Sequence, residues 1–122
     1  MAEHNKLGKA GEEAALRYLT SNDYIIRHRN WKSGKRDLDI VAVKNRKLIV
    51  VEVKTRTNED YGDPEDAVTN KKIRHIIEST DEYIKMYKID LPVRFDIISV
   101  TGTEPPFHIE HFPDAFYPPI WK

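Results

Sequence analysis

Two runs of apolar, mostly β-branched residues lie in the middle of the chain and constrain its fold more than any other feature. They cover residues 38–43 and 48–53 and are separated by four polar residues. Each run has the length and composition of a β-strand, and strands joined by so short a connection pair as an antiparallel hairpin. The sequence therefore predicts a β-hairpin near its centre.

The turn of this hairpin determines which residues of the two strands face each other. With residues 45–46 as the two loop positions, Asp39 falls opposite Glu52, and Asp37 falls opposite Lys54. Side chains alternate in direction along a strand, so all four point to one face of the sheet. The β-carbon atoms of directly opposed residues lie roughly 4.5–5.5 Å apart. The hairpin is thus predicted to bring carboxylates and a lysine together.

Two carboxylates at that separation repel each other unless a cation lies between them or one of them is protonated. Hard oxygen ligands without histidine or cysteine suit Mg²⁺ or Mn²⁺, which polarises a phosphoryl group and activates a bound water. The ammonium group of Lys54 can position that water or neutralise charge that develops on the phosphate. The alternative is an ordinary surface ion pair between Glu52 and Lys54, which the residues alone leave open.

Hydrophobic periodicity and turn signals predict the remaining elements. A second long helix ends near Tyr87 and begins either at Asp63-Pro64 or after Thr69. In chain order, the expected elements are a helix over residues 8–20, strands over 24–31, 38–43 and 48–53, this second helix, and strands over 93–100 and 107–112. The order α-β-β-β-α-β-β indicates a mixed α/β or α+β fold around one sheet.

Length and composition limit the class of protein. The chain of 122 residues is expected to form one domain over residues 1–122, with a tail rich in proline and aromatic residues from about residue 113. The absence of cysteine excludes disulfides, thiolate zinc sites and cysteine nucleophiles, and it favours a cytoplasmic protein. No stretch is apolar and long enough for a membrane span or a signal peptide, so no membrane partner is expected.

Charge is balanced over the whole chain but unevenly distributed. Twenty basic side chains balance twenty acidic ones, yet residues 1–26 carry a net charge of −1, residues 27–57 of +7 and residues 58–122 of −6. The basic segment contains the predicted hairpin and could attract a polyanion such as DNA. The same lysines and arginines could equally form a solvated surface.

Several further residues are candidates for contacts with phosphate. Lys71 and Lys72 lie in the first turns of the second helix, against the preference of the helix dipole for acids there, so they either contact phosphate or are solvated. Thr55 and Arg56 directly follow Lys54, where they could hold a neighbouring phosphate. Together with Arg36, these residues form the predicted nucleic-acid contacts.

Histidines and tail aromatics are weaker candidates. His108 and His111 suggest a metal site, but their spacing on a strand points them to opposite faces, so we expect ordinary surface residues. His75 is likewise expected to be solvated. The tail aromatics are expected to cover the sheet rather than to recruit a partner; they are Phe112, Phe116, Tyr117 and Trp121.

Two patterns resemble known families. Asp39, twelve intervening residues and then Glu52-Val53-Lys54 resemble the PD-(D/E)xK signature of restriction-endonuclease-like nucleases. A longer set of segments resembles the YraN-like uncharacterised bacterial proteins, which are generally placed near archaeal Holliday junction resolvases by fold. In order over almost the whole chain, these segments are Gly8-Lys9-Ala10-Gly11-Glu12 with Tyr18-Leu19, Asp37-Leu38-Asp39-Ile40-Val41, Val51-Glu52-Val53-Lys54-Thr55-Arg56, Gly62-Asp63-Pro64 with Ala67-Val68, Arg94-Phe95-Asp96 and Ala115-Phe116.

The resemblance implies a restriction-endonuclease-like core and a role for each site residue. It implies that Asp39 and Glu52 are metal ligands, with Val53 included in the ligand set, and that Lys54 is the catalytic lysine. Glu12 would approach the same site from the first helix, although an acid in a first helical turn is also favoured by the helix dipole alone. The family usually has Gly-Glu where this chain has Arg36-Asp37.

Two classes of function follow as hypotheses. The first is an endonuclease that uses Mg²⁺ or Mn²⁺ to hydrolyse phosphodiester bonds in branched or single-stranded DNA. The alternative is a non-catalytic nuclease-fold module that binds nucleic acid, or one that binds a protein through its aromatic tail. Junction resolvases act as two-fold pairs, so a homodimer is one candidate assembly, although the sequence shows no clear dimerisation surface.

Overall fold

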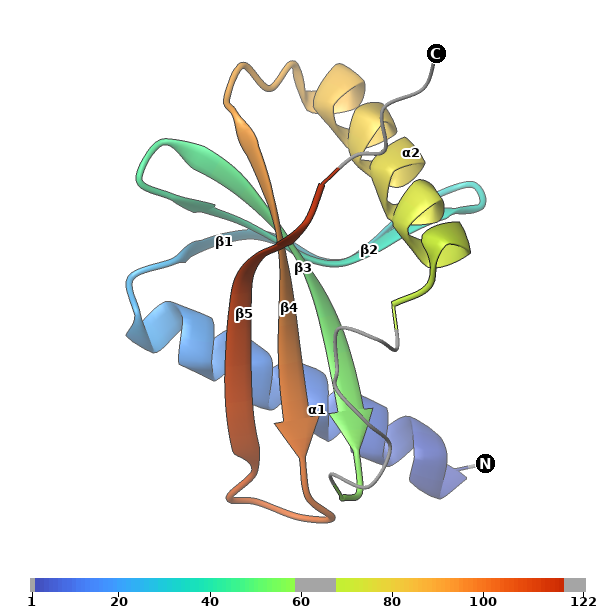
Figure 1. Ribbon diagram of the computed structural model, residues 1–122, viewed down its shortest axis with the longest axis vertical. Coiled ribbons are helices and arrows are strands. Elements are labelled where there is room, and N and C mark those ends of the chain that lie inside the picture. Colours follow the sequence, from blue (N-terminus) through green and yellow to red (C-terminus); the bar gives the residue numbers. More distant parts are fainter. Residues whose placement is uncertain (1, 59–67, 118–122) are drawn as a thin grey trace.

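The computed structural model describes residues 2–58 and 68–117, with side chains from residue 6 onward, and contains one five-stranded sheet with a helix on each face (Figure 1). The elements are α1 (Ala2–Ser21), β1 (Ile25–Ser33), β2 (Arg36–Lys44), β3 (Lys47–Arg56), α2 (Asn70–Tyr87), β4 (Val93–Thr101) and β5 (His108–Phe116). Neighbouring strands follow the order β1-β2-β3-β4-β5. Only β3 and β4 pair in parallel, and α2 lies between them in the chain. The predicted mixed α/β fold and element order are confirmed.

The central hairpin forms with the predicted turn. Asn45 and Arg46 have φ angles of 50° and 62°, and two consecutive left-handed residues give the twist that joins antiparallel strands in a two-residue loop. The predicted register holds from the pair Lys44 and Lys47 to the pair Ile40 and Val51.

Beyond that last pair, β2 turns away from β3. Figure 1 shows β2 running to one side while β3 continues along the sheet. The carboxylate of Asp39 takes the place of a main-chain acceptor, because its Oδ2 accepts a hydrogen bond of 2.9 Å from the N–H of Val53. The predicted register therefore fails for both Asp39 with Glu52 and Asp37 with Lys54, since the two strands do not pair beyond Ile40 and Val51. The divergence opens the sheet beside the predicted site.

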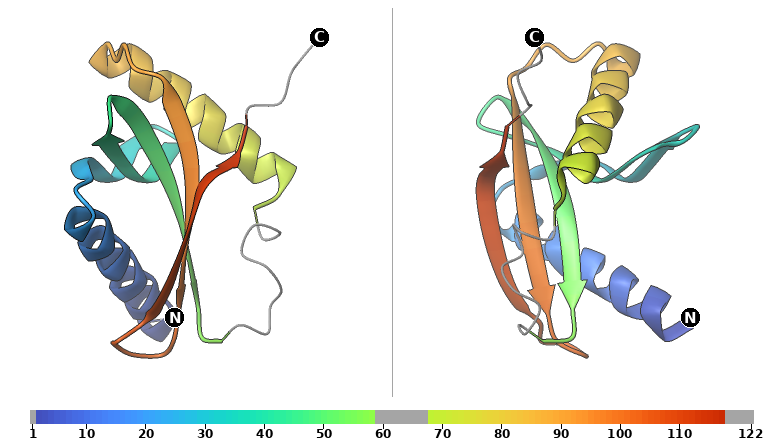
Figure 2. Two further views of the ribbon diagram at one scale, coloured as in Figure 1. Left: turned by 60° about the vertical axis from the view of Figure 1, so that its left-hand side comes forward. Right: turned by 45° about the vertical axis from the view of Figure 1, so that its right-hand side comes forward.

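Two apolar cores lie on the two faces of the sheet, as the helices on opposite sides in Figure 2 indicate. Along β3, Leu48 and Val50 pack toward α2, whereas Ile49 and Val51 pack toward α1. This alternation follows from the two-residue period of a strand. All four side chains are at most 2% exposed, so β3 is buried on both faces. Glu52 continues the α2 side of this pattern and interrupts the apolar run with a charge.

Helix α1 approaches β3 closely at Gly11. A Cβ atom built on this glycine would overlap the side chain of Thr55 and lie only 2.7 Å from its Cγ2. Because Gly11 has no side chain, α1 settles onto the side chain of Thr55 and brings the neighbouring Glu12 to the end of β3. No helix among residues 2–58 and 68–117 is long and apolar enough to cross a membrane.

Helix α2 begins after Thr69, the second of the two predicted starts. Thr69 is extended, with φ −72° and ψ 164°, and its side chain accepts a hydrogen bond from the N–H of Lys72. This contact satisfies one of the free donors of the first turn. The other predicted start, Asp63-Pro64, lies outside the described residues.

Strand β5 is longer than predicted and includes the beginning of the predicted tail. Residues 113–116 belong to the strand, and Phe116 pairs with Phe95 of β4. Pro113 fits because β5 is an edge strand, where a residue without an N–H donor is tolerated. Phe112 and Phe116 pack against the α2-side core, as predicted, while Tyr117 is 68% exposed. Trp121 lies outside the described residues.

Candidate functional site

Carboxyl groups from three elements gather where β2 leaves β3. Asp39 comes from β2, Glu52 from β3 and Glu12 from α1. Asp39 lines two adjoining cavities, one of about 360 Å³ shared with Glu12 and Lys54, and a smaller one shared with Glu52 and Lys72. Because the sheet is open at this point, Asp39 lies between acids that approach from opposite faces. The structure therefore brings together the predicted residues Asp39, Glu52, Lys54 and Glu12.

Glu52 is the most strongly perturbed acid of this group. Its side chain is 7% exposed. The pKa of Glu52 is raised to about 8, first by burial and then by a hydrogen bond to Asp39 and the charge of that carboxylate, while Lys72 and Lys54 act in the opposite direction. Two carboxyl groups that share one apolar place cannot both ionise without compensation. A cation bound between them would provide that compensation.

Glu12 has an oxygen that no protein group satisfies. Within the described part of the chain, the Oε1 atom of Glu12 is the buried side-chain oxygen that lacks a hydrogen-bond partner. Burial raises the pKa of Glu12, and the nearby charge of Asp39 raises it further. The alternative that Glu12 serves only the helix dipole does not account for a side chain that reaches inward. A buried acceptor without a partner, beside the carboxylate of Asp39, is typical of a place for a cation or an ordered water.

Two lysines from different elements flank Glu52. The Nζ atom of Lys54 on β3 lies 3.9 Å from Oε2 of Glu52, and the Nζ atom of Lys72 on α2 lies 3.5 Å from the same oxygen. These side chains are 30% and 38% exposed, so both ammonium groups also face solvent. Lys71, the neighbouring lysine, is exposed and does not line the cavity. The N-terminal turn of α2 therefore contributes one lysine, rather than two, to the site.

Asp37 and His75 form a pair at the rim of the smaller cavity. Nε2 of His75 lies 2.7 Å from Oδ1 of Asp37, and this hydrogen bond lowers the pKa of Asp37 despite partial burial. The prediction that His75 is merely solvated is therefore wrong. Sequence reasoning missed the pair because the two residues are distant in the chain and meet only when α2 packs on β2.

The other predicted nucleic-acid contacts, Arg36, Thr55 and Arg56, lie in three different settings. Arg36 forms an exposed ion pair of 2.6 Å with Glu78 of α2. Thr55 lies beneath α1 at Gly11 and also lines the larger cavity. The carbonyl of Arg56 accepts a hydrogen bond from the N–H of Gly102, which ties the end of β3 to β4. Of these residues, Thr55 lines the cavity that contains Glu12 and Asp39, whereas Arg36 is engaged by α2.

The chemistry of the donor set can be compared with what a divalent cation needs. Among residues 2–58 and 68–117, no three histidine, cysteine or acidic side chains are arranged as a complete metal cage. Mg²⁺, however, is commonly held by one or two carboxylates and keeps several waters. Asp39 and Glu52 supply such a pair, and Val53 could contribute only its carbonyl oxygen because its side chain is apolar. The residues present fit a hydrated Mg²⁺ or Mn²⁺ ion.

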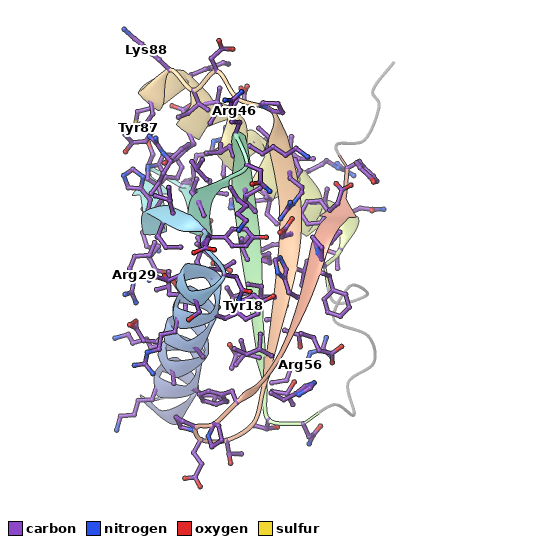
Figure 3. The ribbon with its side chains drawn as sticks, turned by 90° about the vertical axis from the view of Figure 1, so that its left-hand side faces the viewer. Tyr18, Arg29, Arg46, Arg56, Tyr87 and Lys88 are labelled. Atoms are coloured by element: carbon purple, nitrogen blue, oxygen red, sulfur yellow. The ribbon has the colours of Figure 1, made fainter. Side chains whose placement is uncertain are left out.

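A second buried charge cluster lies on the α1 face and was missed. Asp96 of β4 is fully buried and binds Arg94 through both carboxylate oxygens, at 2.8 and 2.9 Å. His111 of β5 lies 2.7 Å from Asp96 through Nε2 and 3.0 Å from the hydroxyl of Tyr18 through Nδ1. Figure 3 shows Tyr18 reaching from α1 toward the strands. The prediction that His111 is an ordinary surface residue is therefore wrong.

A sequence signal for this cluster was available in the strand itself. Arg94 and Asp96 interrupt an apolar strand two residues apart, and charges within such a run need a partner. The partner His111 could not be identified, because the register between β4 and β5 depends on a bulge between Phe95 and Ile97.

Comparison with known proteins gives a consistent family match. A family model described as "Uncharacterised protein family UPF0102" matches residues 11–100. A UPF0102 protein of Phocaeicola vulgatus is 62% identical over 121 residues, covering 99% of this chain and 100% of the relative. A UPF0102 protein of Bacteroides fragilis is 60% identical over 121 residues, with 99% and 100% coverage. One of Flavobacterium psychrophilum is 45% identical over 117 residues, covering 96% of this chain and 98% of the relative.

Proposed function

This chain belongs to the UPF0102 family, and we propose from its site that it is a nuclease that uses Mg²⁺ or Mn²⁺ to hydrolyse DNA phosphodiester bonds. The observation that carries the proposal is the contact between the buried Glu52 and Asp39, beside Lys54 and Lys72. Such an arrangement is unfavourable on a surface that binds nothing, because ionisation of both acids holds like charges together away from water. It is favourable in a site that receives a cation and a phosphate.

Asp39 and Glu52 would hold the metal ion, which when bound supplies Lewis-acid polarisation of the phosphoryl group and a water of lowered pKa. Asp39 is fixed for this task, because its Oδ2 is anchored by the N–H of Val53. The carboxylate of Glu52 is held by the packing of β3 between two cores. Both ligands are thus positioned before any ion arrives.

The remaining side chains would act on the water and the phosphate. Lys54 lies beside Glu52 with its ammonium partly in solvent, where it can orient the attacking water or neutralise charge on the phosphate oxygens. Lys72 approaches from α2 and can bind a second phosphate oxygen. The free Oε1 of Glu12 can accept a hydrogen bond from the attacking water and so fix its direction.

Cleavage assays with matched variants test this proposal. A panel of branched, flapped, nicked and single-stranded DNA would be incubated with Mg²⁺ or Mn²⁺, and Asp39→Ala or Lys54→Ala is expected to abolish cleavage. Lys47→Ala is the matched control, because Lys47 is an exposed lysine at the other end of the same strand. Mn²⁺ binding, measured by calorimetry, is expected for the native chain and not for Asp39→Ala. Absence of both cleavage and Mn²⁺ binding would refute the proposal.

One observation favours a second candidate, a module that binds nucleic acid without cutting it. Lys54 and Lys72 already lie within ion-pair distance of Glu52, so the site can be partly neutralised without metal. Under this alternative, Lys54→Ala weakens DNA binding and lowers its salt dependence in EDTA, and added Mg²⁺ changes neither quantity.

A further inference from the structure

A second surface with unusual chemistry lies at the opposite end of α2 from the candidate site. The rings of His28 and Tyr87 have centroids 4.9 Å apart, and those of Tyr83 and Tyr87 are 4.6 Å apart. The guanidinium carbon of Arg27 lies 5.8 Å from the centre of the Tyr83 ring and 5.9 Å from that of Tyr87. We call Arg27, His28, Tyr83 and Tyr87 the aromatic platform.

The platform is held in place by hydrogen bonds at its polar atoms. The hydroxyl of Tyr87 accepts a hydrogen bond of 3.2 Å from Nε1 of Trp31. The hydroxyl of Tyr83 accepts one of 2.9 Å from Nε of Arg27 and lies 2.7 Å from Nδ1 of His28. Tyr83 is fully buried, whereas Tyr87 is 37% exposed. The partly exposed Tyr87 is therefore held by the hydrogen bond from Trp31 and by the neighbouring rings of His28 and Tyr83. This restraint lowers the entropy lost when a ligand stacks on it.

Among residues 2–58 and 68–117, no carboxylate forms an ion pair with Arg27. Its side chain is exposed and contacts the two tyrosines Tyr83 and Tyr87. Two acids of α2 pair with other residues, Asp81 with Lys85 at 2.8 Å and Glu78 with Arg36 at 2.6 Å. The platform thus presents a cation and an aromatic face together, a combination that attracts an anion with a flat ring.

Two exposed apolar residues lie close to the platform residues in the chain. Ile25 is 68% exposed and lies on the same strand as Arg27, and Met86 is 48% exposed next to Tyr87. Figure 3 shows Tyr87 at the outer side of the molecule, at the end of α2 next to Lys88. An aromatic face with exposed apolar residues on the same elements suits a nucleobase, which has a broad apolar surface.

We infer that the aromatic platform binds an unpaired nucleotide of a single-stranded nucleic acid, with a base stacked on Tyr87 and a phosphate beside Arg27. This site is separate from the carboxylate site and binds without metal. Lys72 and Tyr87 lie about 22 Å apart along the axis of α2, at roughly 1.5 Å per residue. A strand of about seven nucleotides, at roughly 3.4 Å each, spans that length. The two sites can therefore engage one strand that passes along α2.

Binding of oligothymidine is measured in EDTA, so that bound metal cannot contribute to the affinity. The affinity for a fluorescein-labelled 15-nucleotide strand would be measured by anisotropy, and Tyr87→Ala is expected to weaken it about tenfold, as expected for loss of one stacked base. Tyr117→Ala is the matched control, because Tyr117 is 68% exposed and lies at the end of β5, outside the platform. Tyr87→Trp, which keeps an aromatic face, is expected to retain binding.

Fluorescence gives a direct readout of stacking. In a Trp121→Phe background, Trp31 is the remaining tryptophan, and its indole N–H donates to the hydroxyl of Tyr87. Binding of the strand is expected to change the emission of Trp31, and Tyr87→Ala is expected to remove that change. Circular dichroism of Tyr87→Ala checks that the variant is folded.

Two outcomes would overturn the inference. One is equal affinity for the 15-nucleotide strand in the native chain and a folded Tyr87→Ala variant. The other is unchanged strand affinity together with altered self-association of Tyr87→Ala in light scattering, which would identify the platform as a protein interface. Failure of the proposed nuclease activity would give a different result. The chain would then show no metal-dependent cleavage but would still bind the strand in EDTA.

Discussion

Asp96 and Glu52 are both buried carboxyl residues, but their surroundings affect them in opposite ways. Burial alone would raise the pKa of Asp96, yet hydrogen bonds from His111, Arg94 and the N–H of Asp114 outweigh it and lower that pKa. Glu52 has a second carboxyl group as its hydrogen-bond partner, and its pKa rises. The ionised form of Asp96 therefore stabilises the fold, whereas the ionised form of Glu52 destabilises it.

Asp96→Asn tests the stabilising cluster. The change leaves Arg94 with a neutral partner, so we expect a loss of about 3–5 kcal/mol in the free energy of unfolding at pH 7, measured by urea titration. Because the folded state lowers the pKa of Asp96, its contribution is present above the ordinary carboxyl pKa and is lost as pH falls through the lowered folded value. The variant should therefore lose part of the acid dependence of stability. Asp81→Asn, at an exposed ion pair, should change stability little.

Glu52→Gln tests the strained residue. Removal of a buried charge beside Asp39 is expected to stabilise the chain by about 1–2 kcal/mol in EDTA at pH 8, measured by thermal unfolding. The same variant is expected to lose Mn²⁺ affinity. A decrease in stability would show that the lysines, rather than repulsion, dominate the energetics of Glu52.

The position of α1 on the sheet depends on one glycine, and a second glycine in the same helix provides a control. We expect Gly11→Ala to destabilise the chain by about 1–3 kcal/mol, because the new methyl group overlaps Thr55 and displaces α1. Gly8 has no atom within 4 Å of its would-be Cβ, so Gly8→Ala should stabilise the helix by roughly 0.5–1 kcal/mol. Chemical denaturation of both variants makes the comparison. Equal effects would mean that α1 and β3 do not touch at this point.

Elements encoded by local signals could be predicted, and those set by distant contacts could not. The hairpin followed from the β-branched runs and their short connection, and Thr69 identified the start of α2. The divergence of β2 from β3 could not be predicted, because it depends on a side chain, Asp39, that replaces a main-chain acceptor. The extension of β5 to Phe116 was missed because Pro113 was read as the end of a strand rather than as an edge-strand residue.

At the scale of the whole molecule, the uneven charge pattern predicts salt-sensitive binding despite a net charge of zero. The affinity for single-stranded DNA in EDTA should fall linearly with the logarithm of the salt concentration. Arg27→Gln and Lys72→Gln should each lower the slope by about one, because each removes one phosphate contact. Lys85→Gln should leave the slope unchanged, since Lys85 is paired with Asp81. Slopes that do not change in any variant would place the contacts elsewhere.

The mixed sheet also has a kinetic consequence. The β2–β3 hairpin closes through a two-residue turn and can form in microseconds, whereas the parallel pairing of β3 with β4 requires the chain to return through α2. Asp39 and Glu52 therefore meet before Lys72 is in place, so repulsion between them is expected to slow an early step of folding. Refolding should accelerate at a pH low enough to protonate one of the two acids, and a φ-value near one at Val50 would identify the hairpin as the folding nucleus.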